Sequence, residues 1–131
     1  MFAFSEAALE KCAGTTLLWL GEPKQALIHT RHALALHGSA SESWMQMHPL
    51  ISRFDEAQAW AQLGHPDEAA MLGSQIFTAG RDAAQDVIGP LVHKGRELLE
   101  MLAPHGKLAE VRNYTEQFHA LTRRPGLALQ A

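Results

Sequence analysis

The chain has 131 residues, a hydrophobic fraction of 47% and a formal net charge of −3, with a sequence pI near 6.2. Its length fits one compact domain, because single domains usually have about 100–150 residues. The weakly acidic balance argues against direct binding of nucleic acid, since such domains concentrate Lys and Arg and have a pI above about 9. The one cysteine, Cys12, excludes an intramolecular disulfide and a cluster of thiolate metal ligands.

The N-terminal stretch lacks the positive region and apolar core of a secretory signal. No apolar run reaches the roughly 18 residues that a membrane span needs. We therefore expect a cytoplasmic protein that does not enter a membrane, and a lone cysteine fits that reducing compartment.

Two helices are expected first, over about 4–20 and 23–37. Apolar or small residues recur in both at intervals of three and four, the pattern of an amphipathic helix. Gly21 is expected to end the first helix in a left-handed conformation, and Pro23 to open the second where no N–H is needed. The predicted buried stripes are Leu9, Cys12, Ala13, Thr16, Leu17 and Leu20 in the first helix and Ala26, Leu27, Thr30, Ala33 and Leu34 in the second.

The third helix is expected to begin at Ser41 or Ser43. Pro49 should kink it or separate a short helix from the main one, because proline has no N–H for the helical ladder. The fourth helix is expected over 66–79, where Gly73 would let another helix approach closely. The predicted buried stripes are Leu50, Phe54, Ala57, Trp60 and Ala61, then Ala69, Ala70, Gly73, Ile76 and Phe77.

The fifth and sixth helices are expected over about 84–103 and 108–122, with the regular part of the fifth beginning at Gly89 or Pro90. No segment alternates apolar and polar residues, so no sheet is expected. Residues 123–131 should form a flexible tail. The predicted buried stripes are Ile88, Leu91, Val92, Gly95, Leu98, Leu99 and Leu102, then Leu108, Val111, Thr115, Phe118 and Leu121 or Thr122.

A turn sequence recurs along the chain at a nearly constant interval. Leu-Gly-Glu-Pro-Lys-Gln-Ala at 20–26 aligns with Leu-Gly-His-Pro-Asp-Glu-Ala at 63–69, and a fainter copy, Pro-His-Gly-Lys-Leu-Ala-Glu-Val, stands at 104–111. The turn glycines are 43 and 42 residues apart, and such a period is typical of stacked supersecondary units. The sequence therefore predicts one all-α domain over 1–122. It should consist of six main helices in three antiparallel hairpins, at about 4–38, 42–80 and 84–122.

The hairpins resemble the tetratricopeptide repeat, in which a turn glycine is followed by a small residue five positions later and another seven after that. Gly21, Ala26 and Ala33 fit this spacing, and Gly14 fits a small position seven residues before the turn. The resemblance implies a right-handed solenoid of stacked hairpins. The period exceeds the family's usual length of about 34 residues, so longer links between hairpins are expected to absorb the excess.

A narrower resemblance rests on Leu-Gly-His-Pro-Asp-Glu-Ala-Ala at 63–70 with Arg-Glu-Leu-Leu-Glu-Met-Leu-Ala-Pro-His at 96–105. These segments are similar to the C-terminal repeat region of actinobacterial helix-turn-helix regulators. The resemblance implies a regulatory role, as the ligand-sensing or dimerising part of a transcriptional regulator system. A DNA-binding domain precedes the repeats in those proteins, so we expect a fragment, a stand-alone relative or a partner without a DNA-reading half.

The repeat resemblance also implies a concave groove lined by the first helix of each hairpin. Trp19 is its strongest candidate, because an exposed tryptophan near polar residues is a typical binding hot spot. The alternative is that Trp19 covers the edge of its own hairpin. The expected groove residues are Lys11, Thr15 and Trp19, then Phe54, Gln58 and Gln62, then His93, Arg96 and Glu100.

Other chemistry-bearing residues favour structural roles. The eight histidines include His29 and His32 on one helix face, but no His-Glu-x-x-His motif or cysteine pair accompanies them. Cys12 is expected to be a small buried hydrophobe rather than a nucleophile. Met45 and Met47 either fill a gap between hairpins or form an adaptable binding surface. We expect no metal, no cofactor and no catalytic constellation.

The sequence thus predicts a module that binds a peptide, a protein segment or a small signalling ligand in its groove. One alternative is a small-molecule-binding protein or small enzyme on the same scaffold, because fold does not dictate function. Another is a structural oligomeriser, such as a homodimer, whose groove is filled by its own C-terminal tail or by a second copy.

Overall fold

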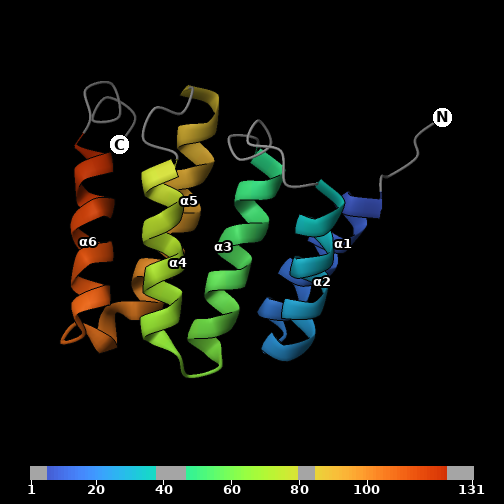
Figure 1. Cartoon of the computed structure of the whole chain (residues 1–131), viewed down its shortest axis with the longest axis horizontal. Helices are drawn as coiled ribbons and strands as arrows, with labels where there is room; N and C mark the ends of the chain where they lie inside the picture. Colours follow the sequence, from blue (N-terminus) through green and yellow to red (C-terminus); the bar gives the residue numbers. More distant parts are fainter. Residues whose placement is uncertain (1–5, 38–46, 80–84, 124–131) are drawn as a thin grey trace.

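The computed structural model describes residues 6–37, 47–79 and 85–123. Over these ranges it contains six α-helices, a short 3₁₀ helix and no strand, which confirms the predicted all-α class (Figure 1). None of these helices is long and apolar enough to cross a membrane. In chain order the elements are α1 (Glu6–Trp19), α2 (Pro23–His37), α3 (Met47–Gln62), α4 (Pro66–Ala79), α5 (Gln85–Leu102), η2 (Ala103–His105) and α6 (Ala109–Thr122).

The helices stand side by side, with α1 and α2 at one end of the molecule and α6 at the other (Figure 1). Each helix packs against its neighbour in sequence, and α4 also packs against α6. The central helix, α3, contacts both α1 and α5, so the first helices of the hairpins form a continuous row. That row positions the site described below. The right-handed superhelix stays a prediction.

The first two turns are built around glycines with positive φ, 74° at Gly21 and 87° at Gly64. In each turn the glycine N–H bonds three residues back and the next N–H bonds five residues back, as in Glu22 N to Leu17 O at 2.8 Å. This is the Schellman arrangement that glycine favours. The third turn differs, because Gly106 has a φ of −62° and follows η2. The third copy of the turn therefore resembles the first two in sequence but has a different backbone conformation.

The larger core lies between α3, α4, α5 and α6 and is centred on aromatic rings. Phe77 stacks on Tyr114, with ring centroids 5.1 Å apart, and meets Phe54 edge-on at 5.8 Å. The Tyr114 hydroxyl donates a 2.7 Å hydrogen bond to the carbonyl of Gly95, which satisfies it in the core. The stripes predicted for α2 and α4 are largely confirmed, whereas the burial of Tyr114 was not expected from the sequence.

The stripe predicted for α1 is wrong. Leu9 and Leu20 are 57% and 69% exposed, and Cys12 is exposed as well. The buried residues of α1 are Gly14 and Leu18, because the missing side chain of Gly14 lets Thr30 of α2 approach. The helix carries apolar residues around most of its circumference, so its apolar pattern does not determine which face is buried. The close contact between Gly14 and Thr30 determines it.

Two prolines bear on the predicted helix boundaries. Pro49 falls in the first turn of α3, where an N–H is not needed, and the short separate helix predicted before it lies almost wholly outside the described residues. Pro90 lies inside α5, which begins at Gln85 rather than at Gly89 or Pro90. The expected helix start at Ser41 or Ser43 lies outside the described residues, as do the tail from 124 onward and the side chains of Met45 and Met47.

The close approach at Gly73 gives the first testable prediction. A Cβ at this position would collide with the ring of Tyr114 and with Leu98 of α5. We expect Gly73→Ala to lower the free energy of unfolding by about 2 kcal/mol, because the packed core cannot yield without strain. Urea denaturation measures the change.

Gly106→Ala is the matched control. Its added Cβ would meet only the Ala103 carbonyl oxygen, at 3.6 Å, an ordinary contact distance. We expect a change of less than about 1 kcal/mol. Equal losses in the two variants would contradict the packing of α4 against α6.

Candidate functional site

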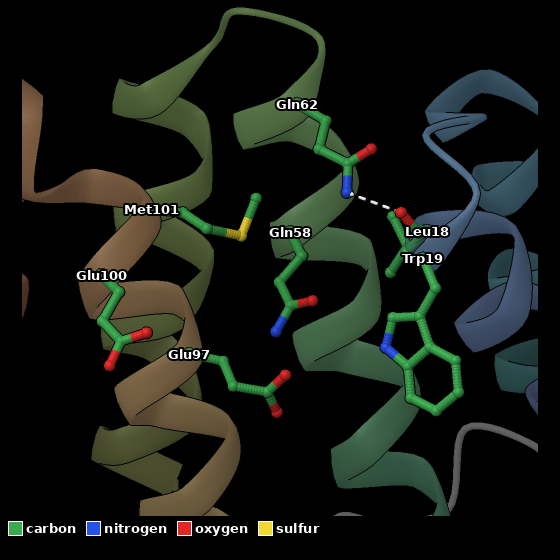
Figure 2. A pocket seen from close by; sticks show the side chains of 7 residues that line it. All are labelled: Leu18, Trp19, Gln58, Gln62, Glu97, Glu100 and Met101. Atoms are coloured by element: carbon green, nitrogen blue, oxygen red, sulfur yellow. Dashed lines mark hydrogen bonds between the residues drawn. The ribbon is translucent and has the colours of Figure 1, made fainter.

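An open groove of about 460 Å³ lies along the row formed by α1, α3 and α5 (Figure 2). Each of the three helices contributes two or three side chains to its lining. Four of the seven lining side chains are carboxylates or amides, and the others are the apolar side chains of Leu18, Trp19 and Met101. The lining residues are Leu18 and Trp19 of α1, Gln58 and Gln62 of α3, and Glu97, Glu100 and Met101 of α5.

Trp19 forms the α1 wall of the groove and is 77% exposed. It is the last residue of α1, and the glycine turn that follows fixes its backbone. Gln62 of α3 donates a 3.1 Å hydrogen bond to the neighbouring Leu18 carbonyl, drawn dashed in Figure 2, and so ties this end of α1 to α3. The indole covers little of its own hairpin. Its large apolar face is available to a partner.

Gln58 extends from α3 between the two walls (Figure 2). The residue is only 6% exposed, and its Nε2 is buried with no hydrogen-bond partner among the described residues. A buried donor without a partner costs about 1–3 kcal/mol, so native proteins rarely leave one without a reason. An acceptor entering the groove would satisfy it.

The α5 wall is acidic. Glu97 and Glu100 stand one turn apart and both line the groove, whose lining contains no Lys or Arg. The Glu97 Oε1 lies 3.5 Å from the Nε2 of His93 and 3.8 Å from the Nζ of Lys94. Glu100 is exposed and has no ion pair within the described part of the chain. The groove thus presents negative charge opposite an aromatic ring.

A buried polar cluster joins the three helices behind the groove. Asp55 of α3 is fully buried and accepts a 2.9 Å hydrogen bond from the ammonium of Lys94 in α5. Its second oxygen accepts a 2.5 Å hydrogen bond from the hydroxyl of Thr15 in α1. Burial raises the pKa of the Asp55 carboxyl above its ordinary value, against the opposing charge of Lys94 and the bond from Thr15. We call these three residues the interhelix cluster.

The interhelix cluster and the groove lining share one helical register. On α3, Gln58 and Gln62 stand three and seven residues after Asp55. On α5, Glu97 and Met101 follow Lys94 at the same intervals. Residues at such spacing lie on one face of a helix. The pairing behind the groove therefore determines which side chains face it.

Four of the predicted groove residues are brought together, namely Trp19, Gln58, Gln62 and Glu100. Whether they bind a ligand stays a prediction. The placement of Phe54 in the groove is wrong, because its ring is fully buried against Phe77 in the core.

The other four predicted residues lie outside the groove lining. Thr15 belongs to the interhelix cluster, and its hydroxyl oxygen also lies 3.1 Å from the carbonyl oxygen of Lys11. Lys11 itself is half-buried. Arg96 turns toward α6, with its guanidinium 5.7 Å from the centroid of the Phe118 ring. His93 is largely exposed beside Glu97.

Sequence reasoning missed Leu18, Glu97 and Met101. A signal for the two α5 residues was present, because the positions chosen in the first two hairpins are spaced by four. The same spacing from His93 would have indicated Glu97 and Met101 instead of Arg96 and Glu100. Leu18 had no such signal, since α1 was given the wrong rotation.

A second polar cluster lies between α1 and α2. The Nδ1 of His29 is 2.6 Å from Glu10 Oε2, and the Nδ1 of His32 is 3.4 Å from Glu10 Oε1. The hydrogen bond with His29 lowers the pKa of Glu10. No group of three or more His, Cys, Asp or Glu side chains in the described ranges is placed to hold a metal ion.

A smaller hollow of about 180 Å³ lies between α2, α3 and α4. It contains Arg53, whose pKa is lowered by burial. The groove between α1, α3 and α5 is larger and brings together more residues that could bind a ligand.

Comparisons of the chain with family models, curated proteins and solved structures give no match. The functional argument therefore rests on the groove and on the residues that shape it.

The interhelix cluster gives a double-mutant prediction. Asp55→Leu leaves the ammonium of Lys94 without its buried partner, and Lys94→Met does the same to the carboxylate. We expect each change to destabilise the fold by about 3 kcal/mol, whereas the double variant should recover most of that loss. Urea denaturation of the four proteins measures the coupling, and purely additive losses would contradict the pair.

The pH dependence of Lys94→Met is a further check on the same pair. Without the opposing charge, burial should raise the pKa of Asp55 more than in the wild type. An acid with a raised pKa in the folded state contributes stability at low pH that is lost as the pH rises through that pKa. The deficit of this variant should therefore shrink as the pH falls from about 7 to about 5.

Proposed function

We propose that this chain is a helical-repeat module that binds an extended segment of another protein in the groove between α1, α3 and α5. The observation that carries the proposal is the exposed indole of Trp19 on the wall of this groove. Tryptophan is among the residues that most often dominate binding energy, because it buries a large rigid surface at little entropic cost.

The shape and polarity of the groove favour a peptide over a small molecule. Sites for small molecules are usually enclosed, whereas this groove is open and offers amides from α3 and carboxylates from α5 beside apolar side chains. An extended segment presents backbone donors and acceptors along its length. It therefore matches a row of polar side chains better than a compact ligand does.

The accessibility of the titratable groups favours binding over catalysis. Asp55 is the carboxylate whose pKa burial raises, but it is fully buried and both of its oxygens already accept hydrogen bonds. A general acid or base must reach the proton that it transfers. Asp55 is placed to hold helices together rather than to meet a substrate.

The wider role that we propose is regulatory and cytoplasmic. The resemblance of 63–70 and 96–105 to the repeat region of helix-turn-helix regulators supports this role, and the lone cysteine suits a reducing compartment. In that role, binding of a protein segment in the groove would signal that its partner protein is present. A small signalling ligand and homodimerisation stay predictions.

The test is to select peptides from a random phage-displayed library on the immobilised chain and to measure their affinities for variants. Trp19→Ala should weaken binding by about thirtyfold, the effect of losing a hot spot of about 2 kcal/mol. Its unfolding midpoint in urea should stay near that of the wild type, because the indole is largely exposed.

Ile28→Ala is the matched control, since Ile28 is also an exposed apolar residue but lies on α2 and outside the groove lining. It should leave peptide affinity unchanged. A library that yields no binder, or binders that lose as much affinity from Ile28→Ala as from Trp19→Ala, would contradict the proposal.

A further inference from the structure

The charge of the groove selects against acidic and for basic ligands. Glu97 and Glu100 both face it from α5, and its lining contains no Lys or Arg. Lys94, which is bound to buried Asp55, lies 3.8 Å from Glu97 and compensates part of its charge, whereas Glu100 has no ion pair within the described part of the chain. An acidic segment would be repelled by the free carboxylate of Glu100, whereas a basic side chain would be attracted.

The aromatic wall suits the same side chains. Trp19 presents an exposed ring on the side of the groove formed by α1, opposite the acidic α5 wall (Figure 2). A tryptophan face attracts ammonium and guanidinium groups, and the aliphatic stem of Lys or Arg can pack on the same ring. The aromatic wall and the acidic wall thus favour the same kind of side chain.

The unpartnered amide of Gln58 indicates that the ligand carries a hydrogen-bond acceptor as well as a cationic group. Its Nε2 is a donor that needs an acceptor, whereas Lys and Arg side chains carry only donors. A free amine would leave this donor unsatisfied. A peptide supplies the missing acceptor, because each residue has a backbone carbonyl beside its side chain.

We propose that the groove recognises a Lys or Arg residue within a peptide segment. Glu100 receives its cationic head, with Glu97 beside it, Trp19 packs along its stem, and Gln58 donates to a backbone carbonyl of the segment. This inference rests on the proposed function, since it names the class of segment that the groove binds.

The test uses three fluorescein-labelled mixtures of nine-residue peptides, randomised except at the central position. That position holds Lys or Arg in the first mixture, Glu in the second and norleucine in the third. Fluorescence anisotropy at low salt should give the first mixture an affinity at least about tenfold tighter than the other two. Raising the salt concentration should reduce this preference.

The outcomes separate this inference from the proposed function. If no mixture binds, the proposed function fails. If all three bind equally or the Glu mixture binds best, peptide binding stands and the preference for basic segments is overturned. A peptide with the sequence of residues 122–131 is measured alongside, because it contains Arg123 and Arg124. If it binds tighter than every mixture, the occupant is the chain's own tail and the proposal of a partner segment is overturned.

Charge variants locate the recognition on α5. Glu100→Gln should reduce the preference for the basic mixture by about fivefold, because it removes one of the two groove charges. Glu116→Gln is the control, since Glu116 is an exposed acid on α6 outside the groove lining. Equal effects of the two changes would show that overall charge rather than the groove attracts the peptide, and would overturn the proposal.

Gln58→Met distinguishes binding from a structural role. Methionine has a similar length but no donor, so the variant should bind the basic mixture about fivefold more weakly. Its urea midpoint should rise, because an unsatisfied buried donor has been removed. A fall in both stability and affinity would assign Gln58 to the scaffold and overturn its role as a ligand donor.

Discussion

The interhelix cluster of Thr15, Asp55 and Lys94 is the constraint on which the groove depends. It joins the first helices of all three hairpins through one buried carboxylate. A buried ion pair contributes little net stability, because the desolvation of both charges offsets their attraction. Its effect here is geometric. Once Lys94 meets Asp55, the rotation of α5 about its axis is set, and with it the side chains that face the groove.

An adjacent face of α5 is held by a second constraint. Gly95 directly follows Lys94, and a Cβ there would lie 2.7 Å from the Phe77 ring, so the residue must stay small. Its carbonyl also receives the hydroxyl of Tyr114. Polar pairing on one side and aromatic packing on the other leave α5 little freedom to rotate. The packing of α5 in the core therefore places Glu97 and Glu100 on the groove.

Much of the scaffold could be predicted from the sequence because its signals are local. Gly21 and Gly64 act through their own backbone conformation, and the stripes of α2 and α4 follow from apolar and small residues at intervals of three and four. The rotation of α1 could not be predicted, because apolar residues surround it and the contact between Gly14 and Thr30 decides. The burial of Tyr114 depends on partners in two other helices.

The groove was only partly predictable for the same reason. The family resemblance placed it on the first helices, and its spacing reached Trp19, Gln58 and Gln62. The interhelix cluster could not be found in this way, because Asp55 bonds residues 40 positions before it and 39 positions after it. No local sequence pattern encodes such pairs. The pair of Asp55 with Lys94 sets the rotation of α5 and so turns its acidic residues toward the groove.

The most direct test of this account follows the indole N–H resonance of Trp19 by NMR while the Lys or Arg peptide mixture is added. We expect saturable shifts in the wild type and much weaker ones in the Asp55→Leu/Lys94→Met double variant, whose α5 has lost the pairing that sets its rotation. The urea midpoint of the double variant confirms that it is folded. Equal shifts and affinities in the two proteins would show that the interhelix cluster does not position the groove, and would contradict the account.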